Sequence, residues 1–564
     1  MAKLTNHEVA IVMVPLPAQG HLNQLLQLSR LISAYHLPLH FAGTAVHLRQ
    51  AKNRIHGWNP VSTSTVKFHE FPIPNYETPL PNPNSTTKFP SQLMPSFHAT
   101  SHLRHPITAL LQDLSRNYRR VIVIYDSLIA WVLQDAPSIS NVECYSFRSI
   151  SAFSIYSWDK SAVTPEFTEY TRVQFEFREI VNSGNLYNSC YEIEGLYLDW
   201  LAKEKSSRNK QWAIGPLNPV KLYDKNNSLI SHKCMNWLDE QEPNSVIFVS
   251  FGTTTTFSDE QIKELAIGLE KSEQKFIWVL READKGDIFT GESREVELPE
   301  GYEERVGKRG VIVRDWAPQL EILGHRSTGG FMSHCGWNSC MESISMGVPI
   351  LAWPMHSDQP RNAVLVTEML KIGVQLRDWA KRDELVSSVA VAECVQRLMD
   401  SAEGDEMRKR VMEKLEAFLK NREGNRYGSA QIAVLVTKFS RENPMKDWIF
   451  LLGVCEFSSI KWRCVLFISM VQKLRDWRFL HLGPFPFWYL FMLLLSPSCF
   501  RHSIIQSLQP YRMTGMLIPL PLELILLGSR LQETYYCFLV PLTLPILVVA
   551  IYFHWLSMKI FKHA

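Results

Sequence analysis

The chain has 564 residues, of which 46% are hydrophobic and 20% are charged, and its formal net charge is +3. This length exceeds one ordinary hydrophobic core and predicts two or more domains. The small net charge argues against a nucleic-acid partner, and the ten cysteines contain no CxxC pair, which argues against a zinc site or a disulfide scaffold.

Short apolar runs alternate with helical patterns over most of the chain. Alternating strands and helices predict parallel sheets with right-handed crossovers. A stretch rich in Pro, Asn and Lys at Gly215–Ser231 predicts a linker between two α/β domains, residues 1–220 and 221–444. The expected helices include Leu22–Tyr35 and Asp259–Lys271. The expected strands are Val9–Pro15, Leu37–Gly43, Val121–Tyr125, Val246–Phe251, Phe276–Leu280, Val311–Val313, Gly330–Met332 and Pro349–Trp353.

The two ends of the chain differ in character. The apolar run Val9–Pro15 is too short for a secretory signal, so a cytoplasmic protein is expected. Residues 445–564 form an atypical apolar tail, in which only 16 of 120 residues are charged. Phe479–Phe500 and Cys537–Met558 are long apolar stretches, and the second is long enough to span a bilayer. The tail is either a membrane anchor or translated sequence beyond a true stop or splice site, and its prolines favour the second.

The segment from Trp316 to Gln359 holds the densest group of candidate ligand-binding residues. Its sequence is WAPQLEILGHRSTGGFMSHCGWNSCMESISMGVPILAWPMHSDQ. Trp316 follows the expected strand Val311–Val313, at the sheet edge where α/β proteins bind ligands, so it offers a face to a base or packs at the rim of the core. Asp358 and Gln359 follow another strand and suit sugar hydroxyls.

A helix is expected to open at Trp337, directly after a Gly-rich turn. The free N–H groups of a helix N-terminus bind anions, and His334 beside them can donate to a phosphate. Asn338 and Ser339 add donors there or cap the helix. Glu342 suits a ribose diol or lies on a solvated helix face.

Together these residues resemble, nearly position for position and without a gap, the donor-binding signature (PSPG box) of plant UDP-glycosyltransferases. The resemblance implies the GT-B fold, in which two Rossmann-like domains face each other across a cleft. A closing Gln in this family goes more often with glucose. Ser250–Thr253 resemble another family segment that places Thr253 near the phosphates. The implied donor contacts are uracil for Trp316, ribose for Gln319 and Glu342, diphosphate for His334, Asn338 and Ser339, and sugar for Trp337, Asp358 and Gln359, with Ala317 and Gly336 in the same box.

The resemblance also implies a catalytic pair near the N-terminus. Gly20-His21 ends the loop Pro15–His21 and matches the family's general base, whereas a lone His there would otherwise be a surface residue or a cap. Asp126, at the end of VIVIY, matches its acidic partner. Neutral imidazole accepts a hydroxyl proton, and a carboxylate on its other nitrogen fixes the tautomer. The implied reaction is a single displacement with inversion. UDP-sugar is then a co-substrate, and no cofactor or metal is expected because no DxD-like pair lies near the donor box.

The start of the chain, VMVPLPAQGHLNQLLQLSRLISAYHLPLHFAGTAVHLRQAKNR, is similar to the zeatin O-glucosyltransferase subgroup. The similarity implies that glucose moves from UDP-glucose to a hydroxyl of a small plant metabolite, the cytokinin zeatin. The loops Pro79–Phe97 and Phe147–Trp158 are expected to form the acceptor pocket. Phe153, Tyr156 and Trp158 are its candidate lining, or they are core aromatics.

The sequence leaves several alternatives open. The chain lacks a longer loop that the subgroup has after Lys160, which alters the acceptor side. A flavonoid or phenolic O-glucosyltransferase, or a non-catalytic sugar-nucleotide-binding homologue, would share the donor box. A membrane protein anchored by Cys537–Met558 is another class. A nicotinamide oxidoreductase is disfavoured because no GxGxxG follows the first strand. The expected partners are the acceptor and UDP-sugar alone, with a monomeric chain.

Overall fold

The computed structural model describes residues 9–52, 66–85, 88–203, 210–219, 233–284, 294, 296–423 and 436. The chain divides into two compact units, Met1–Leu451 and Leu452–Ala564, and every described residue lies in the first. The apolar stretches Phe479–Phe500 and Cys537–Met558 lie outside the described residues. Among the described helices, none has the length and apolar character needed to cross a membrane.

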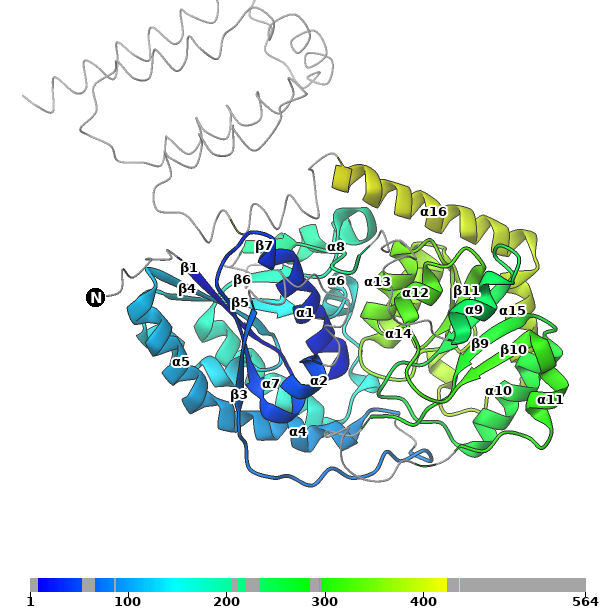
Figure 1. Ribbon diagram of the computed structural model, residues 1–564, viewed down its shortest axis with the longest axis horizontal. Coiled ribbons are helices and arrows are strands. Elements are labelled where there is room, and N and C mark those ends of the chain that lie inside the picture. Colours follow the sequence, from blue (N-terminus) through cyan, green and yellow to red (C-terminus); the bar gives the residue numbers. More distant parts are fainter. Residues whose placement is uncertain are drawn as a thin grey trace, which may run out of the picture. The chain divides into compact units, whose positions relative to one another are not determined.

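A seven-stranded parallel sheet, in the order β3-β2-β1-β4-β5-β6-β7, forms the centre of the N-terminal half (Figure 1). Its strands are nearly continuous apolar runs because helices cover both faces. Val14 pairs with Tyr125 and Asp126 pairs with Phe147, so the carboxyl ends of β1, β4 and β5 meet at one edge. The strands are β1 (Val9–Val14), β2 (Leu39–Thr44), β3 (Val66–Phe71), β4 (Arg120–Asp126), β5 (Val142–Arg148), β6 (Asn182–Tyr187) and β7 (Lys210–Ala213).

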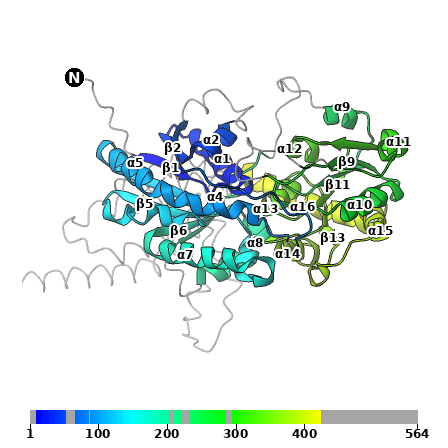
Figure 2. The ribbon, with the colours of Figure 1, turned by 90° about the horizontal axis from the view of Figure 1, so that it is seen from below.

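The helices of the N-terminal half divide between the two faces of this sheet, as Figure 2 shows from below. Ile11 and Met13 of β1 pack with leucines of α1, whereas Val12 and Val14 pack with residues of α5 and α7. Burying one such leucine stabilises the fold by about 1.5–3 kcal/mol. The helices are α1 (Gln19–Ser33), α2 (Ala45–Lys52), α4 (Met94–Ala99), α5 (Arg104–Asn117), α6 (Ala152–Tyr156), α7 (Pro165–Val181) and α8 (Tyr191–Lys203).

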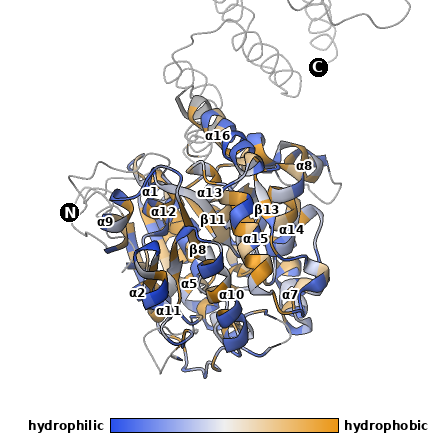
Figure 3. Cartoon of the chain, turned by 90° about the vertical axis from the view of Figure 1, so that its right-hand side faces the viewer, coloured by the Kyte–Doolittle hydropathy of each residue, from blue (hydrophilic) through white to orange (hydrophobic). Residues whose placement is uncertain are grey.

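A six-stranded parallel sheet, in the order β10-β9-β8-β11-β12-β13, forms the centre of the C-terminal half. Figure 3 shows its strands in hydrophobic colours among helices that carry hydrophilic stretches. The strands are β8 (Val246–Ser250), β9 (Lys275–Val279), β10 (Gly310–Val313), β11 (Thr328–Ser333), β12 (Ile350–Ala352) and β13 (Gly373–Gln375). The helices are α9 (Lys233–Asp239), α10 (Asp259–Lys271), α11 (Tyr302–Val306), α12 (Gln319–Leu323), α13 (Trp337–Ser345), α14 (Gln359–Val364), α15 (Ser388–Met399) and α16 (Ala402–Glu423).

The two halves share one buried apolar cluster, which we call the shared cluster. Phe153 and Tyr197 enter it from the N-terminal half, and Trp337 and Ile344 enter it from α13. Helix α16 begins in the C-terminal half and contacts α8 (Figure 1), where the Lys414 ammonium donates to the backbone oxygen of Glu192 at 3.3 Å. The two sheets are therefore joined by a packed interface as well as by the chain.

Each strand predicted from the sequence is present, within three residues of its expected bounds. Strands β3, β5, β6, β7 and β13 were not predicted, because their residues are less apolar or their runs are short. The proposed boundary between residues 220 and 221 falls within residues 220–232, outside the described residues, and stays a prediction.

Candidate active site

Each sheet has one point where the strand order reverses, and the candidate residues lie at these points. In the first sheet the reversal lies between β1 and β4, and in the second it lies between β8 and β11. Ligands of open α/β sheets bind beyond the carboxyl ends of the strands at such points. His21 follows β1 and Asp126 ends β4, while Thr253 follows β8 and His334 follows β11.

His21 and Asp126 lie in direct contact. His21 is in the first turn of α1, and its Nδ1 is 2.7 Å from Oδ2 of Asp126, which is fully buried. The other Asp126 oxygen accepts the backbone N–H of Leu128 at 2.9 Å. His21 is 22% exposed, and its Nε2 makes no hydrogen bond within the described part of the chain. The pair therefore presents Nε2 to a ligand while Nδ1 is held by the carboxylate.

Ser149 is a third member of this group that the sequence did not identify. Its Oγ donates to Oδ2 of Asp126 at 2.7 Å and lies 2.7 Å from Nδ1 of His21. Gln24 holds the same loop by donating to the backbone oxygens of Ser149 at 2.8 Å and Gly20 at 3.1 Å. Ser149 lies inside the predicted acceptor loop Phe147–Trp158. Only the adjacency of β5 to β4 brings it to Asp126, and a single sequence does not give that adjacency.

The environment opposes the charge on each group but favours the charged pair. Burial lowers the pKa of His21. The charge of the Asp126 carboxylate and its hydrogen bond to Nδ1 outweigh this effect, so the pKa of His21 lies above its ordinary value. Burial raises the pKa of Asp126, and the contacts with His21, Leu128 and Ser149 bring it below its ordinary value. The pair is thus suited to accept a proton on Nε2 and to stabilise the imidazolium that forms.

His334 lies between two glycines that leave no room for side chains. A Cβ on Gly252, where φ is +74°, would lie 2.7 Å from Nε2 of His334, and a Cβ on Gly336 would lie 2.5 Å from it. Burial lowers the pKa of His334 to about 4, so the ring is neutral at pH 7. Its Nδ1 is buried with no partner among the described residues. A neutral imidazole can donate one hydrogen bond, from whichever ring nitrogen carries the proton.

The amino end of α13 faces the same region. Gly336 is the N-cap and supplies no side-chain cap, so the first N–H groups of the helix are available to an anion. Asn338 and Ser339 do not cap this helix. The Asn338 amide donates to the backbone oxygen of Gly20 at 2.8 Å, and Ser339 accepts from the Gln319 amide at 3.2 Å. The contact with Gly20 links the donor helix directly to the residue before His21.

Gln319 and Glu342 form a pair beside Trp316. The Gln319 amide donates to Oε2 of Glu342 at 2.7 Å. Burial raises the pKa of Glu342 to about 7, although this hydrogen bond lowers it. Glu342 is therefore not on a solvated face. Trp316 is 57% exposed, and Ala317 is buried against the core. An exposed indole beside a polar pair suits a base and its ribose.

The three predicted sugar contacts are placed differently from one another. Trp337 is buried in the shared cluster, where its indole N–H donates to the backbone oxygen of Asn188 at 2.8 Å, so only its backbone is left for a donor. Asp358 accepts from the Asn362 amide at 2.7 Å, and burial raises its pKa to about 6. Its charge also acts on His21, which places it near the catalytic pair. Gln359 accepts the backbone N–H of Met355 at 2.9 Å.

The predicted acceptor aromatics do not gather in one pocket. Phe153 is buried in the shared cluster, with its ring centroid 4.8 Å from that of Tyr197. Tyr156 packs on Trp200 of α8 at 4.7 Å, and Trp158 is 37% exposed. The contact of Phe153 fits core packing, whereas Tyr156 is 50% exposed and packs on Trp200 at the surface. A role of these residues in acceptor binding stays a prediction. Thr253 is half-buried, and its backbone oxygen accepts a hydrogen bond from the backbone N–H of Asp284 at 2.7 Å.

The described residues contain no group of three or more His, Cys, Asp or Glu side chains that could hold a metal ion. The structure brings a His–Asp pair to the reversal point of one sheet, and His334 and the uncapped amino end of α13 to that of the other. This arrangement fits a two-domain glycosyltransferase. The chain belongs to the family described as UDP-glucoronosyl and UDP-glucosyl transferase, whose model matches residues 225–401. It is a UDP-glycosyltransferase.

Further comparisons agree with this assignment. The glycosyltransferase N-terminal domain model matches residues 7–163 and 158–219, two pieces that meet where the shortened loop was predicted. A zeatin O-glucosyltransferase of Phaseolus lunatus is 54% identical over 426 residues, or 72% of this chain and 91% of that protein. A zeatin O-xylosyltransferase of Phaseolus vulgaris is 48% identical over 462 residues, or 78% of this chain and 100% of that protein.

The fold is also that of solved glycosyltransferases. The structure of UGT2 of Phytolacca americana, complexed with UDP-2fluoro-glucose and pterostilbene, is 25% identical with a TM-score of 0.61, and the likeness covers 77% of this chain and 100% of that one. The predicted GT-B arrangement is confirmed. Residues 449–563 match a different model, phosphatidylinositol N-acetylglucosaminyltransferase subunit Y, in the tail for which the sequence showed no resemblance.

Proposed function

We propose that the chain transfers glucose from UDP-glucose to the side-chain hydroxyl of zeatin. The observation that carries the proposal is the His21–Asp126 contact of 2.7 Å. Asn338 of α13 donates to the backbone oxygen of Gly20, which joins this pair to the helix expected to bind the donor. This link supports a general base beside the end of the site where a sugar diphosphate would lie. The names of the two Phaseolus relatives support zeatin as acceptor.

In the proposed reaction, Nε2 of His21 takes the proton of the acceptor hydroxyl as its oxygen attacks C1 of the sugar. The C1–O bond to the diphosphate breaks, and its electron pair leaves with UDP. Attack opposite the leaving group inverts C1, so an α-linked donor gives a β-glycoside. His334 and the amino end of α13 stabilise the charge on the departing diphosphate. The Asp126 carboxylate stabilises the imidazolium until its proton is released to water.

In this proposal each donor contact keeps the role that the family resemblance implies. Trp316 stacks on uracil, while Gln319 and Glu342 bind the ribose diol. Asn338, Ser339 and Thr253 contact the diphosphate. The sugar is held by Asp358 and Gln359, together with the backbone of Trp337. Aromatic stacking of a base contributes about 1–3 kcal/mol, so Trp316 is a principal contact in this proposal.

A transfer assay with product mass as readout tests the proposal. Full-length protein and residues 1–445 are each given UDP-glucose or UDP-xylose with trans-zeatin, cis-zeatin or flavonols. A zeatin hexoside from both proteins is expected, and the second would show that the tail is dispensable. Flavonol glucosides without a zeatin product would reject zeatin and retain the enzyme class. A pentoside formed faster than the hexoside would reject glucose.

His21→Ala provides the matched control for catalysis. This variant is expected to lose nearly all transfer while still binding UDP, because His21 touches the acceptor and not the nucleotide. Retained transfer would remove His21 from the role of base. A protein that binds UDP but glycosylates no acceptor would instead favour the non-catalytic alternative.

A further inference from the structure

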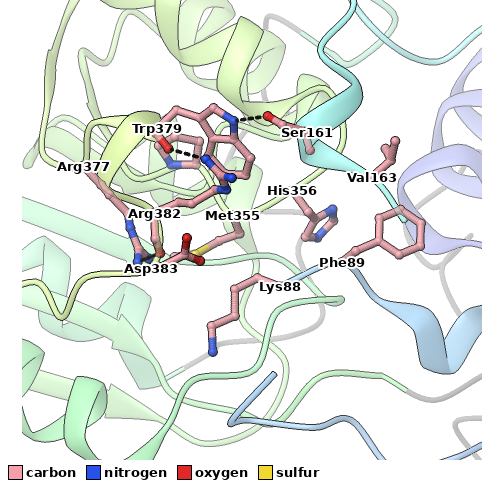
Figure 4. A pocket seen from close by; sticks show the side chains of 12 residues that line it. Lys88, Phe89, Ser161, Val163, Met355, His356, Arg377, Trp379, Arg382 and Asp383 are labelled. Carbon is pink, nitrogen blue, oxygen red and sulfur yellow. Dashed lines mark hydrogen bonds between the residues drawn. The ribbon is translucent and has the colours of Figure 1, made fainter. Parts of the chain in front are cut away.

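A cavity of about 280 Å³ lies between the two halves, outside the group formed by His21 and Asp126. Its N-terminal wall includes Lys88 and Phe89, which belong to the predicted acceptor loop Pro79–Phe97. Its C-terminal wall includes His356 and the segment after β13 that carries Arg377, Trp379 and Arg382 (Figure 4). Complete ligand pockets hold roughly 300–1,000 Å³, so this space suits part of a ligand.

The cavity contains more positive than negative charge. Lys88, Arg377 and Arg382 are cations, and Asp383 is the one carboxylate in the lining. His356 is neutral because burial lowers its pKa to about 3. Among the described residues no carboxylate forms a direct ion pair with the three cationic side chains, although the negative charges of Asp383 and Glu384 partly offset the lowering of the Arg377 pKa by burial. The lining therefore holds an excess of positive charge that a bound anion would balance.

Arg377 carries the clearest sign of an unfilled partner. It is 6% exposed, and one of its terminal nitrogens donates to the backbone oxygens of Arg382 and of Glu384, the latter at 3.0 Å. Its Nε is buried and has no partner among the described residues. Burial lowers the pKa of Lys88, and the charge of Arg377 lowers it further. A bound anion would stabilise the buried Arg377 and the partly buried Lys88, whose charges disfavour each other.

The cavity wall is hydrogen-bonded to the predicted sugar site. The backbone N–H groups of Met355 and His356 donate to Oε1 of Gln359 at 2.9 and 3.1 Å. From the other half, the backbone oxygen of Ala162 accepts from Ser357 N–H at 2.7 Å, which closes the shortened loop onto this wall. The cavity is therefore enclosed by residues of both halves, which the hydrogen bond between Ser357 and Ala162 joins at this wall.

We propose that this cavity binds an anionic group, a phosphate monoester or a carboxylate, carried by the acceptor at the end remote from the hydroxyl that is glycosylated. Arginine pairs with both anions through two parallel hydrogen bonds. The acceptor is preferred to the donor as the source because the cavity is larger than the carboxylate of a sugar acid and presents the Phe89 and Trp379 rings. This inference rests on the proposed function, and for zeatin the matching class is its nucleoside 5′-monophosphate.

The test compares kcat/KM of the full chain for zeatin, zeatin riboside and zeatin riboside 5′-monophosphate, with UDP-glucose as donor. The phosphate should improve kcat/KM over the riboside by about tenfold or more, as expected for charge-assisted hydrogen bonds. Lys88→Met and Arg382→Met should each bring that ratio towards one. Arg116→Met removes an exposed cation of α5, outside the cavity, and should leave the ratio unchanged.

A binding measurement separates this inference from the proposed function. Calorimetry with UDP present should show tighter binding of the monophosphate than of the riboside, and Lys88→Met should abolish the difference. If zeatin is glycosylated but the phosphate gives no advantage in rate or binding, the inference fails and the function stands. If the monophosphate binds as expected but no cytokinin is glycosylated, the anion site stands and the function fails.

Two further transfer assays, one with UDP-glucuronate and one with inorganic phosphate, identify the source of the anion. A preference for UDP-glucuronate over UDP-glucose that Lys88→Met removes would assign the cavity to the donor and overturn the inference. Inorganic phosphate that accelerates transfer to zeatin as much as the covalent phosphate does would also overturn it, since the anion would then be a separate ligand. Failure of inorganic phosphate to do so supports an anion borne by the acceptor.

Discussion

Replacement of Asp126 by Asn tests the proposed mechanism most directly. The amide keeps the size of the buried side chain but removes the charge that faces Nδ1 of His21 at 2.7 Å. With the charge centres about 4 Å apart and an effective dielectric constant of about 20, the carboxylate stabilises the imidazolium by about 4 kcal/mol. This energy is present only when His21 has taken the proton, so its loss should lower kcat by about three orders of magnitude.

The assay is the initial rate of glucoside formation at saturating UDP-glucose and zeatin, with UDP affinity measured on the same protein. UDP affinity should be nearly unchanged because Asp126 is on the acceptor side. Asp135→Asn is the matched control. It makes the same chemical change at a partly exposed carboxylate paired with Arg104 at 2.7 Å, and it should alter kcat by less than about twofold.

A kcat for Asp126→Asn within about tenfold of the wild-type value would refute this reasoning. It would mean that the imidazolium is stabilised by other groups, such as Asp358, or that proton transfer does not limit the rate. Ser149→Ala would then distinguish the two explanations. A large effect on kcat would show that the rate still depends on the orientation of His21 and favour stabilisation by other groups, whereas an unchanged kcat would favour a step other than proton transfer as rate-limiting.

Other expectations follow from the same geometry. The neutral form of His21 is the base, so kcat/KM should rise with pH through a midpoint above 6.5. Asp126→Asn should move that midpoint down, because the lowering of the pKa by burial is then opposed only by the charge of Asp358; an unmoved midpoint in a rate–pH profile would contradict this. Trp316→Ala should weaken UDP binding about tenfold with kcat retained at saturating donor, and equal affinities by titration would exclude stacking. Gly252→Ala should reduce both UDP affinity and the thermal midpoint, since its Cβ would meet the His334 ring at 2.7 Å; an unaltered protein would show that this ring is free to move. Uridine affinity should increase as pH rises through about 7 if the ionised Glu342 binds the ribose, and Glu342→Gln should flatten that dependence.

The sequence predicted the motifs well and the contacts between them poorly. Continuous apolar runs such as that of β4 identified the parallel strands, and the donor box identified the family. The order of the strands is a tertiary property, so the neighbours of β4 were not known and Ser149 was missed. The motif assigned Trp337 to the sugar but did not show that its indole is buried against the other half of the protein; a sugar contact through its backbone stays a prediction.

The sequence also did not identify the cavity residues that lie outside the predicted strands and helices. Arg377 follows β13, a strand of three residues that carries too weak a pattern to recognise. Lys88 lies in an irregular loop with no pattern of its own. Their meeting in one cavity depends on how the two halves pack, which local sequence does not encode.

The shared cluster constrains how the two halves can be exchanged between relatives. Interfaces between independently moving domains are usually modest and polar, whereas here Phe153 and Tyr197 are buried with Trp337 and Ile344 from the other sheet. A chimaera that joins the acceptor half of one glycosyltransferase to the donor half of another would have to match these faces as well as its active-site loops. Acceptor and donor specificities in this architecture are therefore less modular than the linear order of the two halves implies, and a change on one face requires a complementary change on the other.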